Sequence, residues 1–233
     1  MENADRHDEA SKGPLQNESV FALCAIEDRG AFCSLSPITV YPRATDLFSQ
    51  GLLPQGVFCV HSGLVKLINL AADGKELIVG LRSSGWILGA ASVVIQKPYP
   101  VTAVTLTCCA VHYVPSMEFL RFVRLNPEFS GDLVRLLSCE VNDQTNQLVR
   151  LGTLKARQRL EQLLLQMVPS TKGQKEMRLK LPLKLEEIAQ LIAIKPEHLS
   201  RVLKQIEDEG IIRRHKGWII VSNPERLFKR TTA

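Results

Sequence analysis

The chain has 233 residues, of which 45% are hydrophobic, and this is enough for two domains with apolar cores. No apolar run reaches the length of a membrane span and the first residues are too polar for a signal peptide, so we expect a soluble, cytoplasmic protein without a membrane partner. The net charge of +5 is concentrated at the C-terminal end: residues 172–233 hold 14 Lys and Arg against 8 Asp and Glu, whereas residues 1–171 hold 15 against 16. This basic segment indicates a surface that binds phosphate groups.

The first domain is predicted from short strands. Residues 1–20 form a polar tail without an apolar face, which we expect to be disordered. Apolar residues around Phe32 then predict a short helical piece that docks on the segment after it. The predicted strands are 39–41, 46–49, 57–61, 64–70, 76–81, 86–88, 101–106 and 109–114. Eight short strands separated by turn residues are typical of a sandwich or a β jelly-roll barrel, which we place at residues 21–126.

A long helix is predicted over residues 127–152, beginning at Pro127. At 1.5 Å per residue it is about 37 Å long, and its apolar residues keep an approximate heptad spacing. Such a stripe favours a dimer seam, while packing against the chain's own barrel is the alternative. The predicted seam residues are Leu133, Leu137, Val141 and Leu148. Glu140, in the middle of the stripe, either sets the register of the seam or faces the barrel.

The second predicted domain, residues 153–233, follows a hinge at Gly152. An amphipathic helix comes first, and residues 178–183 are expected to form a strand. Apolar residues at helical spacing then predict two short helices, the second beginning at Pro196 and ending at Gly210. Residues 211–214 and 218–221 alternate like two strands around a turn. Two helices joined by a tight turn and followed by a hairpin form a winged helix-turn-helix.

The outward face of the second short helix suits the reading of DNA bases. Glu197, Ser200 and Arg201 lie near its start, where a recognition helix meets base edges. Arginine binds guanine O6 and N7, and glutamate accepts a hydrogen bond from cytosine N4. The candidates for contacts with the DNA backbone are Lys195, His198, Lys204 and Lys216. The plainer alternatives are an ordinary Glu–Arg surface pair on a helical cap, and an interaction module that no longer binds DNA.

The run EEIAQLIAIKPEHLSRVLKQIEDEGII, residues 186–212, resembles the helix-turn-helix of the Crp/Fnr transcription regulators. Glu197, Ser200 and Arg201 match the E-x-x-S-R motif of the Fnr-like branch, whereas Pro196 stands where the cyclic-AMP receptor branch usually has an arginine. The resemblance implies an α+β protein with an N-terminal cyclic-nucleotide-binding-like β jelly-roll barrel, a long dimerisation helix and a C-terminal winged helix-turn-helix. It also implies a homodimer that reads an inverted repeat of TTGAT-like half-sites in double-stranded operator DNA. An activator of this kind would also contact RNA polymerase.

The resemblance also bears on the signal that the barrel senses. Family members that bind cyclic AMP carry G-E-L followed by R-S-A or R-T-A, whose Glu takes the ribose hydroxyl and whose Arg takes the cyclic phosphate. The matching residues here are Ala90 and Val101, so a buried phosphate would lack its cation. Lys97 and Arg82 are other cations in this domain, but the sequence does not place them. We therefore expect a signal other than cyclic AMP, with its cofactor or ligand unknown.

Two alternatives depend on cysteine and histidine. In the cytoplasm the six cysteines are expected to be reduced thiols. Fnr-type oxygen sensors hold a [4Fe–4S] cluster, and a redox or iron–sulfur sensor is one alternative, with the secondary candidate ligands Cys24, Cys33, Cys59 and Cys108. The other alternative is a cupin-like barrel enzyme with an accessory helical domain, which needs a histidine-rich metal group. His61 and His112 are isolated in the sequence, so we expect no catalytic residue, no enzyme activity and no metal site.

Overall fold

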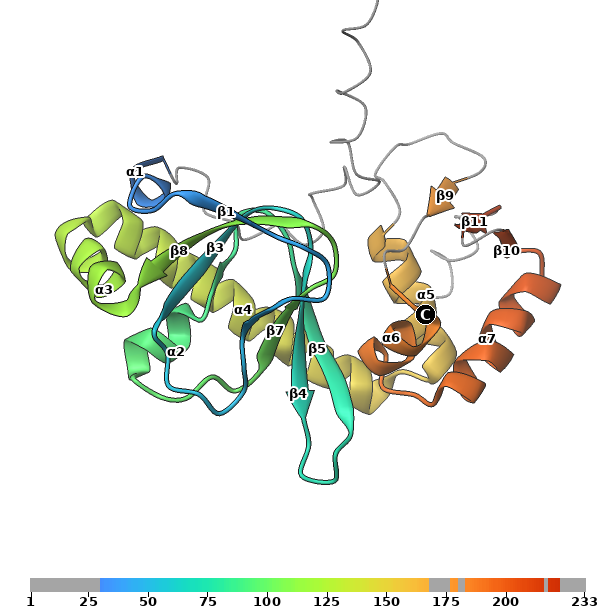
Figure 1. Ribbon diagram of the computed structural model, residues 1–233. Coiled ribbons are helices and arrows are strands. Elements are labelled where there is room, and N and C mark those ends of the chain that lie inside the picture. Colours follow the sequence, from blue (N-terminus) through green and yellow to red (C-terminus); the bar gives the residue numbers. More distant parts are fainter. Residues whose placement is uncertain (1–29, 168–176, 180–182, 216–217, 223–233) are drawn as a thin grey trace, which may run out of the picture.

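The computed structural model describes residues 30–167, 177–179, 183–215 and 218–222. Within these ranges a β-rich N-terminal domain and a smaller C-terminal domain are connected by one long helix (Figure 1). The tail predicted at residues 1–20 lies outside the described residues. After the functions that the sequence predicts for them, the N-terminal domain is called the sensor domain below, and the C-terminal one the DNA-binding domain.

The sensor domain is an antiparallel β structure made of two four-stranded sheets, with strand orders β1-β8-β3-β6 and β2-β7-β4-β5. The strands are β1 (Ile38–Tyr41), β2 (Asp46–Phe48), β3 (Gly56–Ser62), β4 (Val65–Leu70), β5 (Glu76–Arg82), β6 (Ile87–Leu88), β7 (Thr102–Thr105) and β8 (Cys109–Pro115). All eight predicted strands are confirmed, and each end differs from the prediction by at most one residue. The alternation of apolar residues with turn residues is a local signal, and for this reason the sequence placed the strands well.

Three helices complete the sensor domain: α1 (Gly30–Cys33), α2 (Ala90–Ile95) and α3 (Ser116–Leu125). The predicted docking of the segment around Phe32 is confirmed, because this side chain is 1% exposed and stacks on Phe129 with ring centroids 4.8 Å apart. Phe119 and Phe122 contact the same ring. Helices α2 and α3 were not predicted. The aromatic cluster fixes the start of the long helix to the sensor domain.

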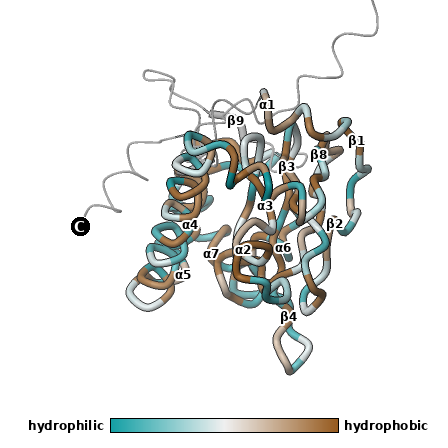
Figure 2. The backbone as a smooth tube through the Cα atoms, turned by 90° about the vertical axis from the view of Figure 1, so that its left-hand side faces the viewer, coloured by the Kyte–Doolittle hydropathy of each residue, from teal (hydrophilic) through white to brown (hydrophobic). Residues whose placement is uncertain are grey.

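The long helix α4 (Pro127–Thr153) has two apolar faces, and Figure 2 shows apolar and polar turns alternating along it. Leu133 and Leu136 are buried in the sensor core, and Leu137 packs against it. Val134 and Val141 are each 64% exposed, and Leu148 is 70% exposed. Leu133 therefore belongs to the core of its own chain and not to the predicted dimer seam. Val134 takes its place on the exposed face, which runs from Val134 through Val141 to Leu148.

The DNA-binding domain contains α5 (Ala156–Met167), β9 (Met177–Leu179), α6 (Leu185–Leu191), α7 (Pro196–Asp208), β10 (Ile212–His215) and β11 (Trp218–Val221). Its three strands form an antiparallel sheet with the order β10-β11-β9. Helices α6 and α7 with this hairpin make the predicted winged helix-turn-helix. The strand predicted at 178–183 is seen at Met177–Leu179, and residues 180–182 lie outside the described residues.

The two domains share one apolar core. Ile78 and Leu81 of the sensor strand β5 belong to the same buried cluster as Ile188 of α6, Leu199 of α7 and Leu164 of α5. Helix α6 lies next to β5 in Figure 1, and their residues are in contact. Because the cluster is continuous, burial of apolar surface between the domains stabilises one relative placement of sensor and helix-turn-helix.

Candidate nucleic-acid interface

The turn between α6 and α7 sets the direction of the second helix. Helix α6 ends in a left-handed residue, Ala193, with φ of 52°. The N–H of Ile194 donates to the carbonyl of Ala189 at 3.0 Å, and the N–H of Ala193 donates to that of Gln190 at 3.1 Å, which is the pattern of a Schellman ending. Lys195 is the N-cap of α7 and Pro196 occupies its first turn. The predicted break at residues 193–195 is confirmed.

Helix α7 has one buried face and one exposed face. The residues that face inward are 4% exposed or less, namely Leu199, Val202, Leu203 and Ile206. The predicted base-reading residues Glu197, Ser200 and Arg201 are all exposed on the other side. Arg201 Nε donates to the backbone carbonyl of Glu197 at 3.4 Å, and none of the ion pairs among the described residues joins these two side chains. The carboxylate and the guanidinium therefore both point to solvent, and the ordinary surface pair does not form.

The predicted phosphate-binding residues lie around the exposed face. Lys195 lies at the start of α7, and His198 and Lys204 are exposed along it. Lys216 lies outside the described residues. Arg213, which the sequence analysis did not single out, is exposed on β10 of the hairpin. His198 and Lys204 share helix α7 with Glu197, Ser200 and Arg201.

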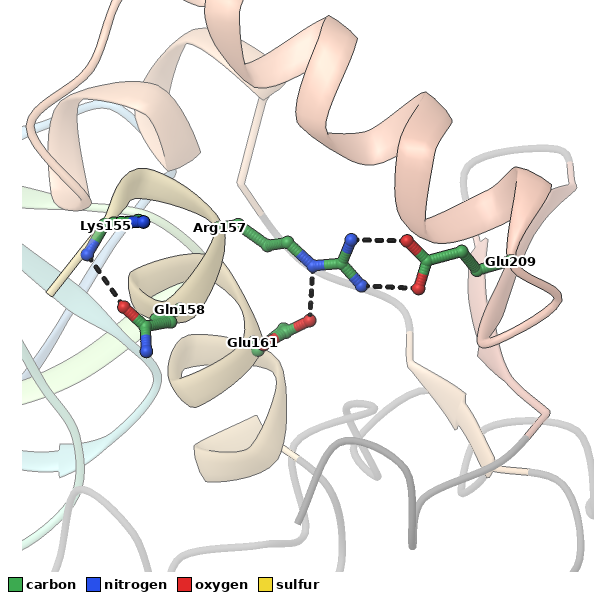
Figure 3. A network of polar contacts seen from close by, with 5 residues as sticks. All are labelled: Lys155, Arg157, Gln158, Glu161 and Glu209. Atoms are coloured by element: carbon green, nitrogen blue, oxygen red, sulfur yellow. Dashed lines mark hydrogen bonds and ion pairs between the residues drawn. The ribbon is translucent and has the colours of Figure 1, made fainter. Parts of the chain in front are cut away.

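An arginine of α5 holds the C-terminal end of α7 (Figure 3). Arg157 donates from Nη2 to Glu209 Oε2 at 2.7 Å, and from Nε to Glu161 Oε1 at 2.8 Å. The hydrogen bonds to Glu209, followed by those to Glu161, outweigh the effect of burial and raise the pKa of Arg157 above its ordinary value. The backbone N–H of Lys155 donates to Gln158 Oε1 at 3.0 Å and completes the start of α5. The two hydrogen bonds from Arg157 to Glu209 fix α7 at the end opposite to Glu197, Ser200 and Arg201.

A second pair joins α7 to the wing. The Glu207 carboxylate accepts hydrogen bonds from the Arg214 backbone N–H at 2.9 Å, from Nε at 3.0 Å and from Nη2 at 2.8 Å. The backbone hydrogen bond and then the side-chain hydrogen bonds from Arg214 lower the pKa of Glu207. No signal in the sequence indicated either pair. Arg157 and Glu209 lie 52 residues apart, and Glu207 and Arg214, which are 7 apart, belong to different elements.

A buried ion pair links the helix-turn-helix to the sensor domain. Lys66 Nζ of β4 lies 2.6 Å from Glu187 Oε1 of α6, and the two side chains are 16% and 12% exposed. Glu187 Oε2 also accepts the backbone N–H of Lys184 at 2.7 Å at the start of α6. Burial by itself raises the pKa of Glu187, but the hydrogen bonds from Lys66 and Lys184, with the charges of Lys66 and Arg43, outweigh it and lower this pKa.

We expect acid to weaken this contact between the domains. A carboxyl group whose pKa is lowered in the folded protein stabilises the fold at every pH above its ordinary pKa, which is 4.5 for Glu187. This stabilisation is lost as the pH falls through the lowered pKa. The free energy of unfolding, measured between pH 7 and pH 3, should therefore fall more steeply for the native chain than for Glu187→Gln. Glu186→Gln, an exposed neighbour in α6, is the matched control and should keep the native slope. Equal slopes for the native chain and Glu187→Gln would contradict the expectation.

The segment that matches the cyclic-AMP cassette is apolar and closely packed. Ala90 begins α2 and is 2% exposed, and Gly89 before it has a φ of 82°. A side chain at Gly89 would lie 2.8 Å from the ring of Tyr99. The Tyr99 hydroxyl donates to the Gly56 carbonyl at 2.7 Å. Burial raises the pKa of Tyr99 despite this hydrogen bond.

Lys97 and Arg82, the two other cations considered for a buried phosphate, have different surroundings. Lys97 is exposed. Arg82 is buried, with its guanidinium 4.3 Å from the centroid of the Trp86 ring and its Nη2 3.0 Å from Glu140 Oε1. Glu140 therefore faces the barrel, one of its two predicted orientations. Arg82 is engaged by the chain's own groups and joins the sensor domain to α4.

The cysteines are only partly brought together. The Sγ atoms of Cys33 in α1 and Cys59 in β3 are 3.9 Å apart. Cys108 is exposed, and Cys24 lies outside the described residues. Cys139 is disulfide-bonded, so the expectation of six reduced thiols is wrong at this position.

The histidines of the barrel form a pair. The rings of His61 and His112 are 6.0 Å apart, and His112 Nδ1 lies 2.8 Å from the Ser36 carbonyl. Among the described residues, no group of three or more His, Cys, Asp or Glu side chains could hold a metal ion. The cupin-like alternative therefore gains no metal centre from this part of the chain. None of the described helices has the length and hydropathy needed to cross a bilayer.

Comparisons with known proteins agree with this arrangement. The cyclic nucleotide-binding domain matches residues 38–126, and the Crp-like helix-turn-helix domain matches residues 158–230. The CRP-like cAMP-activated global transcriptional regulator of Mycobacterium tuberculosis is 26% identical over 95% of this chain and 97% of its own length. The transcriptional activator protein FnrA of Stutzerimonas stutzeri is 26% identical over 73% of this chain and 70% of its own.

The fold is also that of a solved relative. The structure of FixK2 from Bradyrhizobium japonicum is 20% identical, with a TM-score of 0.72 over 83% of this chain and 96% of that structure. Two family matches in the same order as the two domains, together with the exposed polar face of α7, lead to one assignment. The chain belongs to the Crp/Fnr family and is a DNA-binding transcription regulator.

Proposed function

We propose that this regulator is a homodimer that reads an inverted repeat of TTGAT-like half-sites, under the control of a signal other than cyclic AMP. The observation that carries the proposal is the exposed face of α7. Glu197 and Arg201 point to solvent without pairing with each other, on a helix whose far end is fixed by Arg157 and Arg214. Unpaired polar groups on a rigid helix are what direct base reading requires.

The half-site follows from the side chains that α7 presents. Arg201 binds the guanine through O6 and N7, Glu197 accepts from the amino group of a neighbouring base, and Ser200 contacts the adjacent thymine. Pro196 offers no side-chain donor, so the additional arginine contact of the cyclic-AMP receptor branch has no counterpart here. In a two-fold dimer the half-site centres lie about 34–36 Å apart.

Competition between two operators tests this assignment. We expect the native protein to bind an inverted repeat of TTGAT half-sites at least about tenfold more tightly than one of TGTGA half-sites, since one good base contact contributes about 1–3 kcal/mol. Fluorescence anisotropy at fixed salt concentration measures both affinities. Preference for TGTGA would refute the half-site, and equal weak binding to every sequence would refute the function.

The exposed face of α4 supports a dimer. Val134, Val141 and Leu148 alternate with the exposed Ser138 and Thr145 at spacings of four and three residues. Ser138 Oγ donates to the Val134 carbonyl, and Thr145 Oγ1 donates to the Val141 carbonyl, both at 2.8 Å. Their hydroxyls are thus satisfied within the helix and can be buried against a second copy without losing hydrogen bonds. Small residues between the apolar ones allow two α4 helices to approach closely.

The packing of the sensor domain supports a signal other than cyclic AMP. The cassette position Ala90 is buried, Lys97 is exposed and Arg82 is engaged by Glu140. The M. tuberculosis relative is a cAMP-activated regulator, so this chain is expected to differ from that relative in the signal that it senses. We expect calorimetric titration to show no binding of cyclic AMP at micromolar concentrations. A dissociation constant of about 1 μM or lower, near −8 kcal/mol, would contradict this expectation.

A further inference from the structure

A cavity of about 160 Å³ lies where the sensor domain, α4 and the DNA-binding domain meet. Leu81 of β5, Leu151 of α4 and Leu163 of α5 contribute apolar walls, and Ile192 closes it beside the turn of the helix-turn-helix. The cavity is separate from the cassette segment, since neither Ala90 nor Val101 lines it. It is the place where a small molecule would contact both domains at once.

Polar groups without partners line the same cavity. Two buried atoms have no hydrogen-bond partner among the described residues: the acceptor Gln162 Oε1 and the donor Arg159 Nε. Arg150 of α4 is half-buried, and its guanidinium forms no hydrogen bond or ion pair within the described part of the chain. Buried polar atoms are nearly always satisfied in native proteins, so several unsatisfied ones around one cavity indicate that something else satisfies them.

The charge around the cavity favours a single negative charge. Three arginines contribute to the lining, while Asp143 lines it and Glu140 neutralises Arg82, which leaves a net charge of +1. The volume is below the roughly 300–1,000 Å³ of sites for drug-sized ligands, and an apolar cavity of about 150 Å³ holds one benzene molecule. A carboxylate on a short apolar body fits both the charge and the size.

We propose that this cavity binds a small monocarboxylate, with its carboxylate on Arg150 and its apolar body between Leu81, Leu151 and Leu163. The N–H at Arg159 Nε donates a further hydrogen bond to the carboxylate, whereas Gln162 Oε1 is itself an acceptor and takes no hydrogen bond from it. Arg159 also donates from Nη1 to the carbonyls of Leu151 at 3.3 Å and Leu154 at 3.2 Å. It thus holds the junction of α4 and α5.

Arg159 also connects the cavity to the helix-turn-helix, because its Nη2 lies 3.5 Å from the carbonyl of Ala193 in the turn. A carboxylate near its Nε therefore contacts a residue that touches both the interdomain junction and the turn before α7. This consequence for DNA binding rests on the proposed function, whereas binding of the ligand does not.

Titration calorimetry without DNA tests the site, with benzoate and isovalerate as probes and benzamide and isovaleramide as their uncharged counterparts. We expect at least one carboxylate to bind the native protein with a dissociation constant on the order of 1 mM, and its amide at least tenfold more weakly. Arg150→Gln should weaken carboxylate binding at least tenfold. Gln147→Trp, which fills the cavity without removing a charge, should abolish it.

Arg135→Gln is the matched control, since Arg135 lies on the same helix but is exposed and paired with Asp132. It should bind the probes like the native chain. Circular dichroism of each variant confirms that it is folded. The proposal is wrong if neither carboxylate reaches half-saturation at 20 mM, or if Arg150→Gln and Arg135→Gln bind equally well. Because no DNA is present, either result leaves the assignment of α7 untouched.

Discussion

Arg201→Ala is expected to weaken operator binding by about 1–3 kcal/mol per half-site, or roughly 30-fold to 10⁴-fold for a dimer on two half-sites. The guanidinium of Arg201 is exposed on α7, and within its own chain it makes only the long contact from Nε to the Glu197 carbonyl. Removing it therefore costs little folding free energy and removes a contact to base edges. Binding to a library randomised in one half-site should show the preference relaxed at a single base pair.

Lys204→Ala is the matched control for this variant, because Lys204 is exposed on the same helix and is assigned to phosphate. It should weaken all sequences alike and reduce the slope of log affinity against log salt by about one unit for each lost phosphate contact. If Arg201→Ala keeps the sequence preference of the native protein, α7 does not read bases through this residue.

Val141→Asp is expected to convert the proposed dimer into a monomer. Val141 lies at the middle of the exposed apolar face of α4, and a two-fold axis there would bring two aspartates together in a seam poor in water. Burying unpaired like charges should cost about 3 kcal/mol or more, which is roughly a hundredfold in the dimer dissociation constant. Light scattering should then give the 26.0 kDa of one chain instead of twice that mass.

Asn146→Asp introduces the same charge on the same helix and is the matched control. Residue 146 is exposed and lies about 140° around the helix from Val141, away from the seam. It should leave the dimer intact. A native chain that is monomeric at working concentration would contradict the dimer itself, and a dimeric Val141→Asp would place the interface elsewhere.

Local patterns account for the parts of the fold that were predicted. Strand positions, the start of α4 at Pro127, the start of α7 at Pro196 and its end shortly before Gly210 all depend on residues within a few positions. Helix α3 was missed although Phe119 is fully buried, because its short apolar stripe lay next to a longer and more regular one. The candidate base-reading residues could be named from the sequence because they share a motif on one face of one helix.

The seam shows where local patterns are insufficient. Leu133 and Val134 are neighbours with similar hydropathy, but Leu133 is 4% exposed and Val134 is 64% exposed. Periodicity shows that a helix has apolar faces, and it does not show which face meets the chain's own barrel. The packing of α4 on the aromatic cluster decides this, through residues far from the helix in sequence.

The sequence by itself determined the family, the order of the domains, the eight strands and the exposed face of α7, because each depends on short-range spacing or on a contiguous motif. Only the tertiary structure decided how the domains meet. The Lys66–Glu187 pair, the Arg82–Glu140 pair and the cavity beside Arg150 join residues that are distant in the chain. Such contacts exist only once the apolar core shared by the two domains has brought their elements together, since burial is collective and is not encoded at any single position.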